Sequence, residues 1–382
     1  MGTQPPRKRK ATPSCYRVGA LGKGLCILDH LDRSERPLRV QEIAAATGFD
    51  RVTAFRLLCT LESHGYIERL PDKRYRGVTR RRRIRIGYSA PLAGTPFRRD
   101  VTEGIRRAAE EMNIELLVLN NPEDSPEVNV RNADASIEAK VDLVMEFQPF
   151  ESITHVLADR FSSAGIPVVG IETPIPGGIY FGANNYRAGK MAGRVLGQFA
   201  ARHWNGRFDR IVLIASSSFG SAHHARLTGG LDGIREVLGE FNSSRVTTLD
   251  GHTHAETSRI VVAEFLRDLP RNARLLISAL NDPSAIGALQ AVRAAGREEY
   301  VAIVGHNATI ESRAEIRKPE SRLIASVAYF PERYGEKLIR LARSIVNHER
   351  VPLAVYTDHV VLDRHNIDQY YPASPAPPKS RS

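Results

Sequence analysis

Three side chains able to hydrogen-bond to the edges of nucleic-acid bases lie in the first half of one predicted helix. The helix is expected over residues 51–64, and Arg51, Thr53 and Arg56 fall away from its apolar side. Arginine can donate two parallel hydrogen bonds to guanine, and threonine can contact several bases. A helix with such residues near its N-terminus fits the major groove of double-stranded DNA. We therefore predict that these three residues bind DNA.

Basic side chains continue into a β-hairpin that is expected after this helix. Its strands are predicted at residues 66–70 and 75–78. Lys73, Arg74 and Arg76 lie at or beside the turn between them. Such residues can pair with the phosphates that flank the groove, so we predict that all three contact DNA.

The positive charge of the chain is confined to its first quarter. Residues 1–85 hold 20 Lys and Arg against 8 Asp and Glu, whereas the whole chain has a net charge of +11, so the remainder is close to neutral. A field confined to one small region favours a polyanionic partner such as nucleic acid. The run Arg80–Arg83 closes this region. Either it contacts DNA, with Arg81 as a predicted contact, or it forms a solvated linker.

Two further helical patterns precede the helix at 51–64. Leucines at helical spacing predict one over residues 21–31, and another is expected over 40–46. Gly48 suits the turn that follows, and Asp50 is placed to cap the next helix. Two short helices joined by a tight turn and followed by a hairpin indicate a winged helix-turn-helix. The alternative is a three-helix packing module with a solvated basic face.

Residues 20–76 resemble the winged helix-turn-helix of IclR-type transcription regulators. The matching motifs are Lys23-Gly24, Ile27-Leu28, Glu42-Ile43-Ala44, Thr47-Gly48, Arg56-Leu57-Leu58, Thr60-Leu61, the segment 65–69 and Tyr75. The resemblance implies a double-stranded DNA operator as a partner. A homodimer is expected, because two heads on a pseudo-palindrome double the phosphate contacts.

The rest of the chain alternates short apolar strands with helices. An amphipathic helix is expected over residues 100–112. Strands are predicted at 84–88, 114–119, 143–145, 167–171, 210–215, 275–279 and 301–304. This alternation indicates an α/β fold with parallel sheets, in which ligands bind at the carboxyl ends of the strands.

Motifs for catalysis and cofactor binding are missing from this region. The loop after the first strand, residues 89–99, has a single glycine and lacks the GxGxxG pattern of dinucleotide-binding folds. No Ser-His-Asp order, paired carboxylate motif or GxSxG elbow stands out. The pairs His223-His224 and His252-x-His254 lack thiolate or carboxylate companions, so loop histidines are expected, not a metal site. We therefore expect no enzymatic activity, no cofactor and no metal.

Residues 84–371 resemble the ribose-type periplasmic sugar-binding proteins, which also form the effector domain of the lac repressor family. The shared motifs are Thr95-Pro96-Phe97, the segment 164–169, 182–185 with Ala188-Gly189, Arg226 with Gly229, Asn281-Asp282 with 285–289, 304–307, 325–327 with Pro331, and Gly335. The resemblance implies a two-lobed periplasmic-binding-protein-like (type I) α/β body with parallel sheets, preceded by a small winged helix-turn-helix domain. Lobe one would comprise residues 85–184 and 330–358, and lobe two 185–329 and 359–371.

The same resemblance implies which residues face a ligand in the cleft between the lobes. Phe97 would lie against a sugar ring, while Arg226, Asn281 and Asp282 would bind neighbouring hydroxyls. The full predicted set is Ser89, Thr95, Phe97, Arg98, Glu172, Arg226, Asn281, Asp282, Asn307 and Tyr329. Several depart from the family: Thr95 replaces an Asn, Arg98 an aromatic, Glu172-Thr173 an Asp-Arg pair, Asn307 an Asp and Tyr329 a Gln. A different sugar, a cyclitol or a sugar acid is therefore expected in place of ribose.

Cysteine usage and hydropathy suggest a cytoplasmic protein. The three cysteines show no CxxC spacing and are expected as free thiols. No apolar run is long enough to span a membrane, and none follows the basic start, so no membrane partner is expected. The expected organisation is a disordered basic tail (1–15), the winged helix-turn-helix (16–78), an Arg-rich linker (79–84), the two-lobed body (85–371) and a disordered tail (372–382).

The sequence predicts a ligand-responsive DNA-binding transcriptional regulator, with repression relieved by ligand as the favoured sign. Activation fits the same residues. Two alternatives stay open: a cytoplasmic sugar-processing enzyme, and an extracytoplasmic solute receptor with a fused basic head. The first is disfavoured by the missing catalytic motifs. The second is disfavoured by the missing signal peptide and by the basic head.

Overall fold

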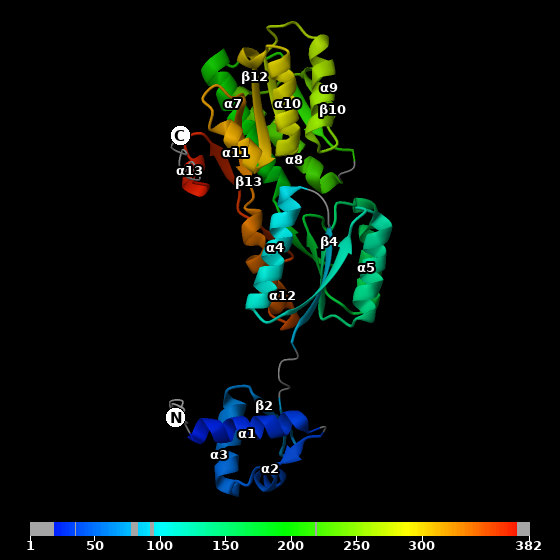
Figure 1. The fold of residues 1–382 in the computed structure, drawn as a ribbon, viewed down its shortest axis with the longest axis vertical. Coiled ribbons are helices and arrows are strands. Elements are labelled where there is room, and N and C mark those ends of the chain that lie inside the picture. Colours follow the sequence, from blue (N-terminus) through cyan, green and yellow to red (C-terminus); the bar gives the residue numbers. More distant parts are fainter. Residues whose placement is uncertain (1–18, 35, 78–82, 92–94, 218–219, 373–382) are drawn as a thin grey trace, which may run out of the picture. The chain divides into compact units, whose positions relative to one another are not determined.

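The chain forms two compact units, residues 1–83 and 84–382 (Figure 1). The computed structural model describes residues 19–34, 36–77, 83–91, 95–217 and 220–372. The predictions for the N-terminal tail, for residues 373–382 of the C-terminal tail and for Arg81 lie outside these ranges. Within them, no helix combines the length and the apolar character that crossing a bilayer requires.

The helices of the first unit lie where the sequence predicted them. They are α1 (Gly19–Arg33), α2 (Val40–Thr47) and α3 (Arg51–Ser63). Gly48 follows α2 with a φ of 73°, and the Asp50 carboxylate accepts a hydrogen bond from the Thr53 backbone N–H at 2.8 Å. A left-handed glycine ends a helix readily, and an aspartate side chain caps the next one. Local sequence therefore sets the turn between α2 and α3.

A small antiparallel sheet completes this unit. The predicted hairpin is present as β2 (Ile67–Arg69) and β3 (Arg74–Gly77), and β1 (Leu38–Arg39) pairs with the other side of β3. Tyr75 on β3 lies in the core with Ile27, Ile43 and Leu58, one from each helix. The unit is a three-helix winged helix-turn-helix, as predicted.

Two of the three leucines that predicted α1 face outward. Leu21 and Leu25 are 62% and 52% exposed, whereas Gly24, Ile27 and Leu31 are buried. Both sets recur at helical spacing, so α1 carries two apolar stripes. The spacing therefore predicted the helix but not the face that packs.

Lobe one of the second unit is built on a six-stranded parallel sheet with the order β14-β8-β7-β6-β4-β5. Its strands are β4 (Arg85–Pro91), β5 (Glu115–Asn121), β6 (Leu143–Phe147), β7 (Val168–Ile171), β8 (Ile179–Gly182) and β14 (Ala354–Tyr356). Its helices are α4 (Pro96–Glu111), α5 (Pro126–Glu138), α6 (Thr154–Ser163) and α12 (Tyr334–Val346), with short 3-10 turns η1 (Glu151–Ile153) and η4 (Pro331–Arg333).

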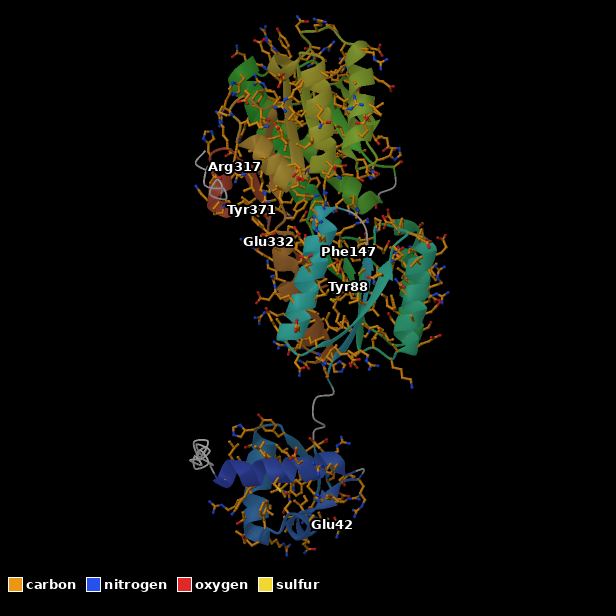
Figure 2. The ribbon with its side chains drawn as sticks, in the orientation of Figure 1. Glu42, Tyr88, Phe147, Arg317, Glu332 and Tyr371 are labelled. Carbon is orange, nitrogen blue, oxygen red and sulfur yellow. The ribbon has the colours of Figure 1, made fainter. Side chains whose placement is uncertain are left out.

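Helices cover both faces of this sheet. Met145 of β6 packs into the core beneath α4 and α12, and its neighbour Val144 packs into the core beneath α5 and α6. Tyr88 and Phe147 belong to the first of these cores (Figure 2). Successive residues of a strand point to opposite faces of the sheet. Because both faces are covered here, neighbouring residues such as Val144 and Met145 are both apolar. This explains the continuous apolar runs in the sequence.

Lobe two repeats the arrangement with the strand order β10-β9-β11-β12-β13-β15. Its strands are β9 (Arg210–Ala215), β10 (Val246–Asp250), β11 (Leu275–Ala279), β12 (Val301–Asn307), β13 (Leu323–Ala328) and the antiparallel β15 (Val360–Asp363). Its helices are α7 (Asn185–Trp204), α8 (Ser221–Leu238), α9 (Ala255–Arg267), α10 (Asp282–Ala294), α11 (Ile310–Ile316) and α13 (Ile367–Tyr370), with η2 (Ser243–Arg245) and η3 (Glu298–Tyr300).

Three segments cross between the lobes, after β8, after β13 and after β14. The backbone N–H of Asn184 in the first donates to Nε2 of His359 in the third at 2.9 Å. The second crossing leads into η4. There the Tyr371 hydroxyl donates to Oε1 of Glu332 at 3.2 Å, and the Arg317 guanidinium donates to the Tyr371 carbonyl at 2.6 Å (Figure 2). Side-chain and backbone bonds therefore join the crossings to each other and to lobe two.

Helices α7 and α8 approach with their backbones in contact. A Cβ on Gly189 would lie 1.8 Å from the Arg226 carbonyl oxygen, and one on Gly193 would lie 2.0 Å from that of Gly230. Only glycine permits such an approach. The contact fixes α8 beside α7, and with it the start of the Arg226 side chain.

Candidate functional sites

The predicted DNA-contacting residues of α3 are available at its surface. Arg51 and Arg56 are exposed and Thr53 is half-buried, while Ala54 and Leu58 are buried on the opposite side. Among the described residues, neither arginine forms an ion pair. Their guanidinium groups therefore keep all their donors for a ligand, as contacts to base edges require.

The basic residues of the hairpin differ in their pairing. Lys73 is exposed at a φ of 61° and forms no ion pair within the described part of the chain. Arg74 pairs with Asp72 at 2.5 Å, and Arg76 pairs with Glu68 at 2.7 Å. Both pairs are solvent-exposed and contribute little to stability. To bind a DNA phosphate, Arg74 and Arg76 would exchange their carboxylate partners for it. Lys73 needs no such exchange.

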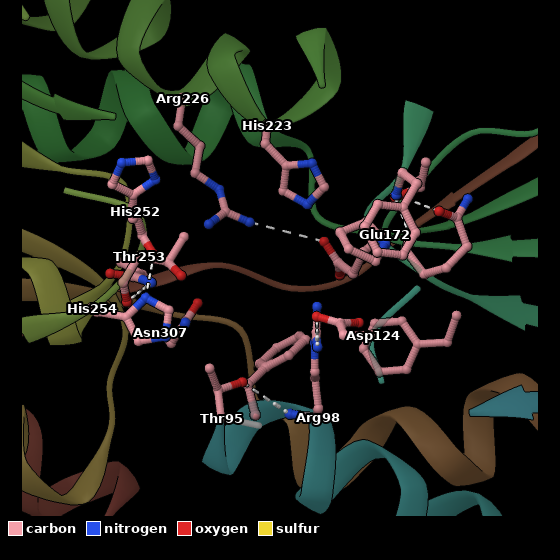
Figure 3. A pocket seen from close by; sticks show the side chains of 17 residues that line it. Thr95, Arg98, Asp124, Glu172, His223, Arg226, His252, Thr253, His254 and Asn307 are labelled. Carbon is pink, nitrogen blue, oxygen red and sulfur yellow. Dashed lines mark hydrogen bonds and ion pairs between the residues drawn. The ribbon is translucent and has the colours of Figure 1, made fainter. Parts of the chain in front are cut away.

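A cavity of about 300 Å³ lies between the two lobes of the second unit (Figure 3). Its volume is at the lower end of the range for small-molecule sites. Lobe one contributes Thr95, Phe97, Arg98, Asp124, Phe147, Gln148, Pro149, Phe150, Glu172 and Thr173. Lobe two contributes His223, Arg226, His252, Thr253, His254, Asn281 and Asn307. Most of these follow the carboxyl ends of parallel strands, where such folds bind ligands.

The structure brings seven of the ten predicted ligand residues to this cavity. They are Thr95, Phe97, Arg98, Glu172, Arg226, Asn281 and Asn307. They come from both lobes, so a ligand bound there would contact both lobes at once. That they bind a ligand stays a prediction.

Arg226 is anchored to lobe two by several contacts. Its Nε donates to Oδ1 of Asn185 at 2.5 Å, and its Nη1 donates to the carbonyl of Leu280 at 3.0 Å. Its guanidinium lies 4.8 Å from the ring centroid of Tyr329. These contacts leave Nη2 facing the cavity, 3.9 Å from Oε2 of Glu172. Arg226 is thus held as a fixed donor.

Glu172 faces Arg226 from the other lobe. Its Oε1 accepts hydrogen bonds from the Tyr334 hydroxyl at 2.7 Å and from the Ala183 N–H at 3.1 Å. Its buried Oε2 has no hydrogen-bond partner among the described residues. Burial raises the pKa of the Glu172 carboxyl, and the nearby Arg226 opposes that rise. One carboxylate oxygen is therefore fixed by hydrogen bonds, and the other is buried beside Arg226 with its acceptor capacity unused.

Three predicted ligand residues do not line the cavity. Asp282 is buried and accepts hydrogen bonds from Ser326 Oγ at 2.7 Å, from the Thr309 N–H at 2.7 Å and from Ser312. Its carboxylate therefore holds the loops beneath the site. Tyr329 lies behind Arg226, and Ser89 accepts a hydrogen bond from Asn129 at 3.0 Å inside lobe one.

The prediction missed lining residues on both lobes. Gln148 follows β6 directly, so the rule that ligands bind at carboxyl strand ends could have identified it. Its buried Nε2 has no hydrogen-bond partner among the described residues. The sequence signalled His223, His252 and His254 only as a possible metal set. The described residues contain no cluster of three or more metal-ligating side chains. Burial, together with Arg226, lowers the pKa of His223 to about 3, so its ring is neutral.

A direct contact joins the lobes at the start of α8. Oε2 of Glu151 in lobe one accepts from the Ser221 N–H at 2.6 Å, and Oε1 accepts from the Ser221 hydroxyl at 2.7 Å. A carboxylate at a helix N-terminus also interacts favourably with the helix dipole. The contact therefore stabilises the arrangement in which the two lobes meet.

The fold and the site define a two-lobed binding domain that shares its chain with a winged helix-turn-helix. The chain belongs to the periplasmic binding protein domain family, whose model matches residues 86–350. The IclR helix-turn-helix domain matches residues 20–71. The predicted combination of these two families in one chain is confirmed.

Curated relatives match the second unit. The ribose import binding protein of Haemophilus influenzae is 23% identical over 280 residues, covering 72% of this chain and 90% of that protein. The ribose import binding protein of Bacillus subtilis is 22% identical over 269 residues, covering 70% of this chain and 83% of that protein.

Solved structures confirm the predicted two-lobed fold. A periplasmic solute-binding protein from Actinobacillus succinogenes with bound D-allose superposes with a TM-score of 0.63 at 19% identity, covering 75% of this chain and 99% of that one. A solute-binding protein from Bacillus halodurans with bound myo-inositol gives 0.64 at 16% identity, covering 75% and 97%. At these identities the likeness shows the fold alone.

Proposed function

We propose that this protein is a transcriptional regulator that senses a sugar or sugar-like molecule in the cavity between its lobes. The observation that carries the proposal is the combination of two sites in one chain. One is a cavity that residues from both lobes line, charged and amide side chains among them. The other is a winged helix-turn-helix whose α3 exposes Arg51 and Arg56, which form no ion pair with any residue that the structure describes. The family models that match these two regions are a periplasmic binding protein domain and an IclR helix-turn-helix domain.

The mechanism follows from the distribution of the cavity residues over two lobes. A ligand that contacts both Glu172 and Arg226 favours the closed arrangement. Closure can change DNA binding only if the ligand binds the DNA-competent and DNA-incompetent states with different affinity. In a homodimer, closure would alter the spacing of two heads on a pseudo-palindromic operator. We propose that ligand binding releases the DNA and relieves repression in the cytoplasm.

A thermal-shift panel of pentoses, hexoses, cyclitols and sugar acids tests the sensing role. A ligand at 100 times its dissociation constant adds about 2.7 kcal/mol to the free energy of unfolding. We expect at least one compound to stabilise the protein and to weaken its binding to an operator selected from random duplexes. No stabilisation by any compound would contradict the proposal, and so would chemical conversion of the bound compound.

The contact between Glu151 and Ser221 predicts a slower release of ligand than the cavity alone would give. Glu151→Gln keeps the shape but loses the charge and one acceptor, so the closed arrangement loses stability. We expect the dissociation rate of the best panel compound, measured by stopped flow, to rise at least about threefold. Glu349→Gln is the matched control, because Glu349 accepts from the Ser344 hydroxyl at 2.7 Å within lobe one.

The same contact predicts a pH dependence. The hydrogen bonds from the Ser221 hydroxyl and N–H hold the pKa of Glu151 below its usual value. Their contribution is complete above the pKa of an unfolded glutamate and is lost as pH falls through the lowered value in the folded protein. Acidification through that range should therefore accelerate release in the wild type but not in Glu151→Gln. Equal acceleration in both would contradict the role of the contact.

A further inference from the structure

The cavity carries as many negative as positive side chains. Apart from histidines, the ionisable residues among those that line it are Arg98, Asp124, Glu172 and Arg226. They form two pairs: Nη1 of Arg98 lies 3.0 Å from Oδ2 of Asp124, and Nη2 of Arg226 lies 3.9 Å from Oε2 of Glu172. Both pairs face the space between the lobes (Figure 3). The formal charge of these four residues is therefore balanced.

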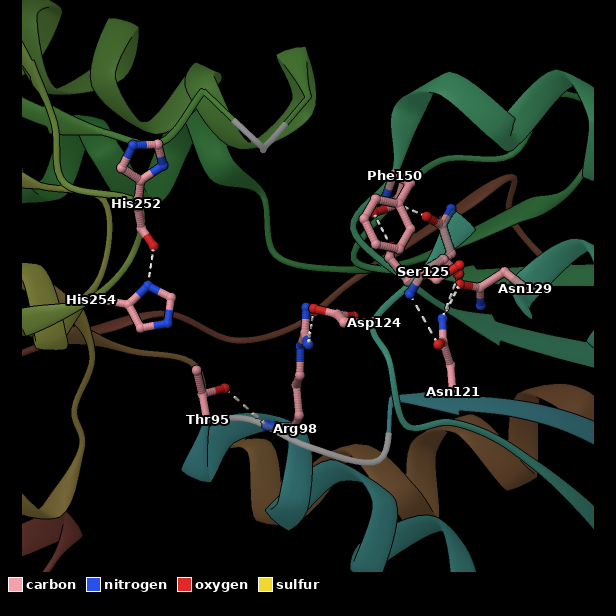
Figure 4. A network of polar contacts seen from close by, with 11 residues as sticks. Thr95, Arg98, Asn121, Asp124, Ser125, Asn129, Phe150, His252 and His254 are labelled. Atoms are coloured by element: carbon pink, nitrogen blue, oxygen red, sulfur yellow. Dashed lines mark hydrogen bonds and ion pairs between the residues drawn. The ribbon is translucent and has the colours of Figure 1, made fainter. Parts of the chain in front are cut away.

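Asp124 is held in place by a closed turn and not by its ion pair alone. It has a left-handed φ of 49°, and its N–H donates to the Asn121 carbonyl at 3.4 Å. The Asn121 side chain closes the turn. Its Oδ1 accepts from the Ser125 N–H at 3.0 Å, and its Nδ2 donates to the Ser125 carbonyl at 2.8 Å. The turn therefore directs the Asp124 carboxylate toward Arg98 (Figure 4).

The turn that Asn121 closes is anchored to the buried interior of lobe one. Asn121 is 2% exposed, and its Nδ2 also donates to Oδ1 of Asn129 at 2.7 Å. Nδ2 of Asn129 donates to Oε1 of the buried Glu146 at 2.7 Å. Buried polar networks of this kind rigidify the groups that they hold. Asp124 is thus a preorganised neighbour of Arg98, although 43% of its side chain is exposed.

An acidic ligand would meet an unfavourable environment here. Its carboxylate would lose water and find both arginines already matched by Asp124 and Glu172, and an unmatched charge in such a site is costly. A hydroxyl group fits better. It brings no charge and can accept from Nη2 of Arg226, which lies 3.9 Å from the buried Oε2 of Glu172 and so too far for a direct hydrogen bond to it.

We propose that Asp124 is a specificity-determining residue, which neutralises Arg98 and so restricts the cavity to uncharged polyhydroxyl ligands. Sugars and cyclitols are accepted, and sugar acids are rejected by the unmatched negative charge that they bring. Asn121 is the positioning residue that sets the Asp124 turn. The inference rests on the proposed function, since it assumes that this cavity binds a sugar-like ligand.

The test compares the full-length wild type with Asp124→Asn by titration calorimetry. The uncharged probes are D-ribose, D-galactose and myo-inositol, and the acidic probes are D-gluconate and D-galacturonate. We expect the wild type to bind uncharged probes only. In Asp124→Asn the ratio of acidic to uncharged affinity should rise at least about tenfold, which corresponds to 1.4 kcal/mol.

Asp134→Asn is the matched control. Asp134 is as exposed as Asp124 and also pairs with an arginine, Arg160, but it lies on α5 and outside the lining of the cavity. The substitution Asp134→Asn changes the net charge by the same amount as Asp124→Asn. In an Arg98→Gln background, Asp124→Asn should give no gain toward acids, because Asp124 acts through Arg98.

Each outcome of this experiment either supports or overturns the inference. A shift in Asp124→Asn that is no larger than in Asp134→Asn overturns the inference, and so does a wild type that prefers the acids. Both of those results leave the sensing role intact. Failure of the wild type to bind any of the five probes overturns the inference, and it overturns the proposed function only if the wider thermal-shift panel is negative as well.

Discussion

Replacing Arg226 with alanine is expected to abolish the ligand response while leaving DNA binding unchanged. The guanidinium is the one cavity donor fixed by Asn185, by the Leu280 carbonyl and by the ring of Tyr329. Its loss removes a ligand contact and leaves Glu172 as a buried carboxylate without its counter-charge. Breaking a buried pair in this way costs about 3–5 kcal/mol. We expect ligand affinity, measured by calorimetry, to fall at least about 100-fold.

The variant Arg235→Ala serves as the control for this prediction. Arg235 lies on the same helix, α8, and pairs with Asp232 at 2.9 Å, outside the lining of the cavity. It should leave ligand affinity unchanged. Operator binding should be the same in both variants, because α3 belongs to the other compact unit. An unchanged ligand affinity in Arg226→Ala would remove Arg226 from the site.

The fold of the second unit was predictable because strands that are buried on both faces of a sheet have apolar residues at successive positions. Val144 and Met145 enter different cores, so β6 begins with the apolar run Leu143-Val144-Met145. The head was predictable for a local reason: Gly48 and Asp50 set the turn between two helices without help from distant residues. The packed face of α1 was not predictable, since Leu21 and Leu25 have the same spacing as the stripe that is buried.

The candidate site was less predictable because its geometry depends on contacts between distant segments. Asp282 directly follows the cavity residue Asn281 in the sequence, but Ser312 and Ser326, from α11 and β13, bind its carboxylate. Asp124 reaches Arg98 only because the Asn121 side chain closes a turn with a left-handed residue. Neither of these two side-chain arrangements produces a periodic pattern in the sequence. The resemblance located the cavity, and the side-chain network decided which residues face it.

Replacing Arg56 with alanine is expected to remove sequence discrimination from the head. Arg56 is exposed on α3 without an ion pair among the described residues, so its guanidinium can donate two bonds to a guanine edge. We expect a loss of about 1–3 kcal/mol on the selected operator and a smaller loss on random duplexes. Fluorescence anisotropy on both duplexes at several salt concentrations measures this difference.

Lys73→Ala separates base reading from phosphate contact. Lys73 lies at the hairpin turn, and an ammonium there meets phosphates that carry no sequence information. Its loss should weaken both duplexes alike and reduce the salt dependence by about one unit of slope. Arg33→Ala, at the exposed end of α1, should change neither duplex. If Arg56→Ala weakens the operator and random duplexes equally, Arg56 contacts only the backbone, and sequence reading must come from other residues of α3.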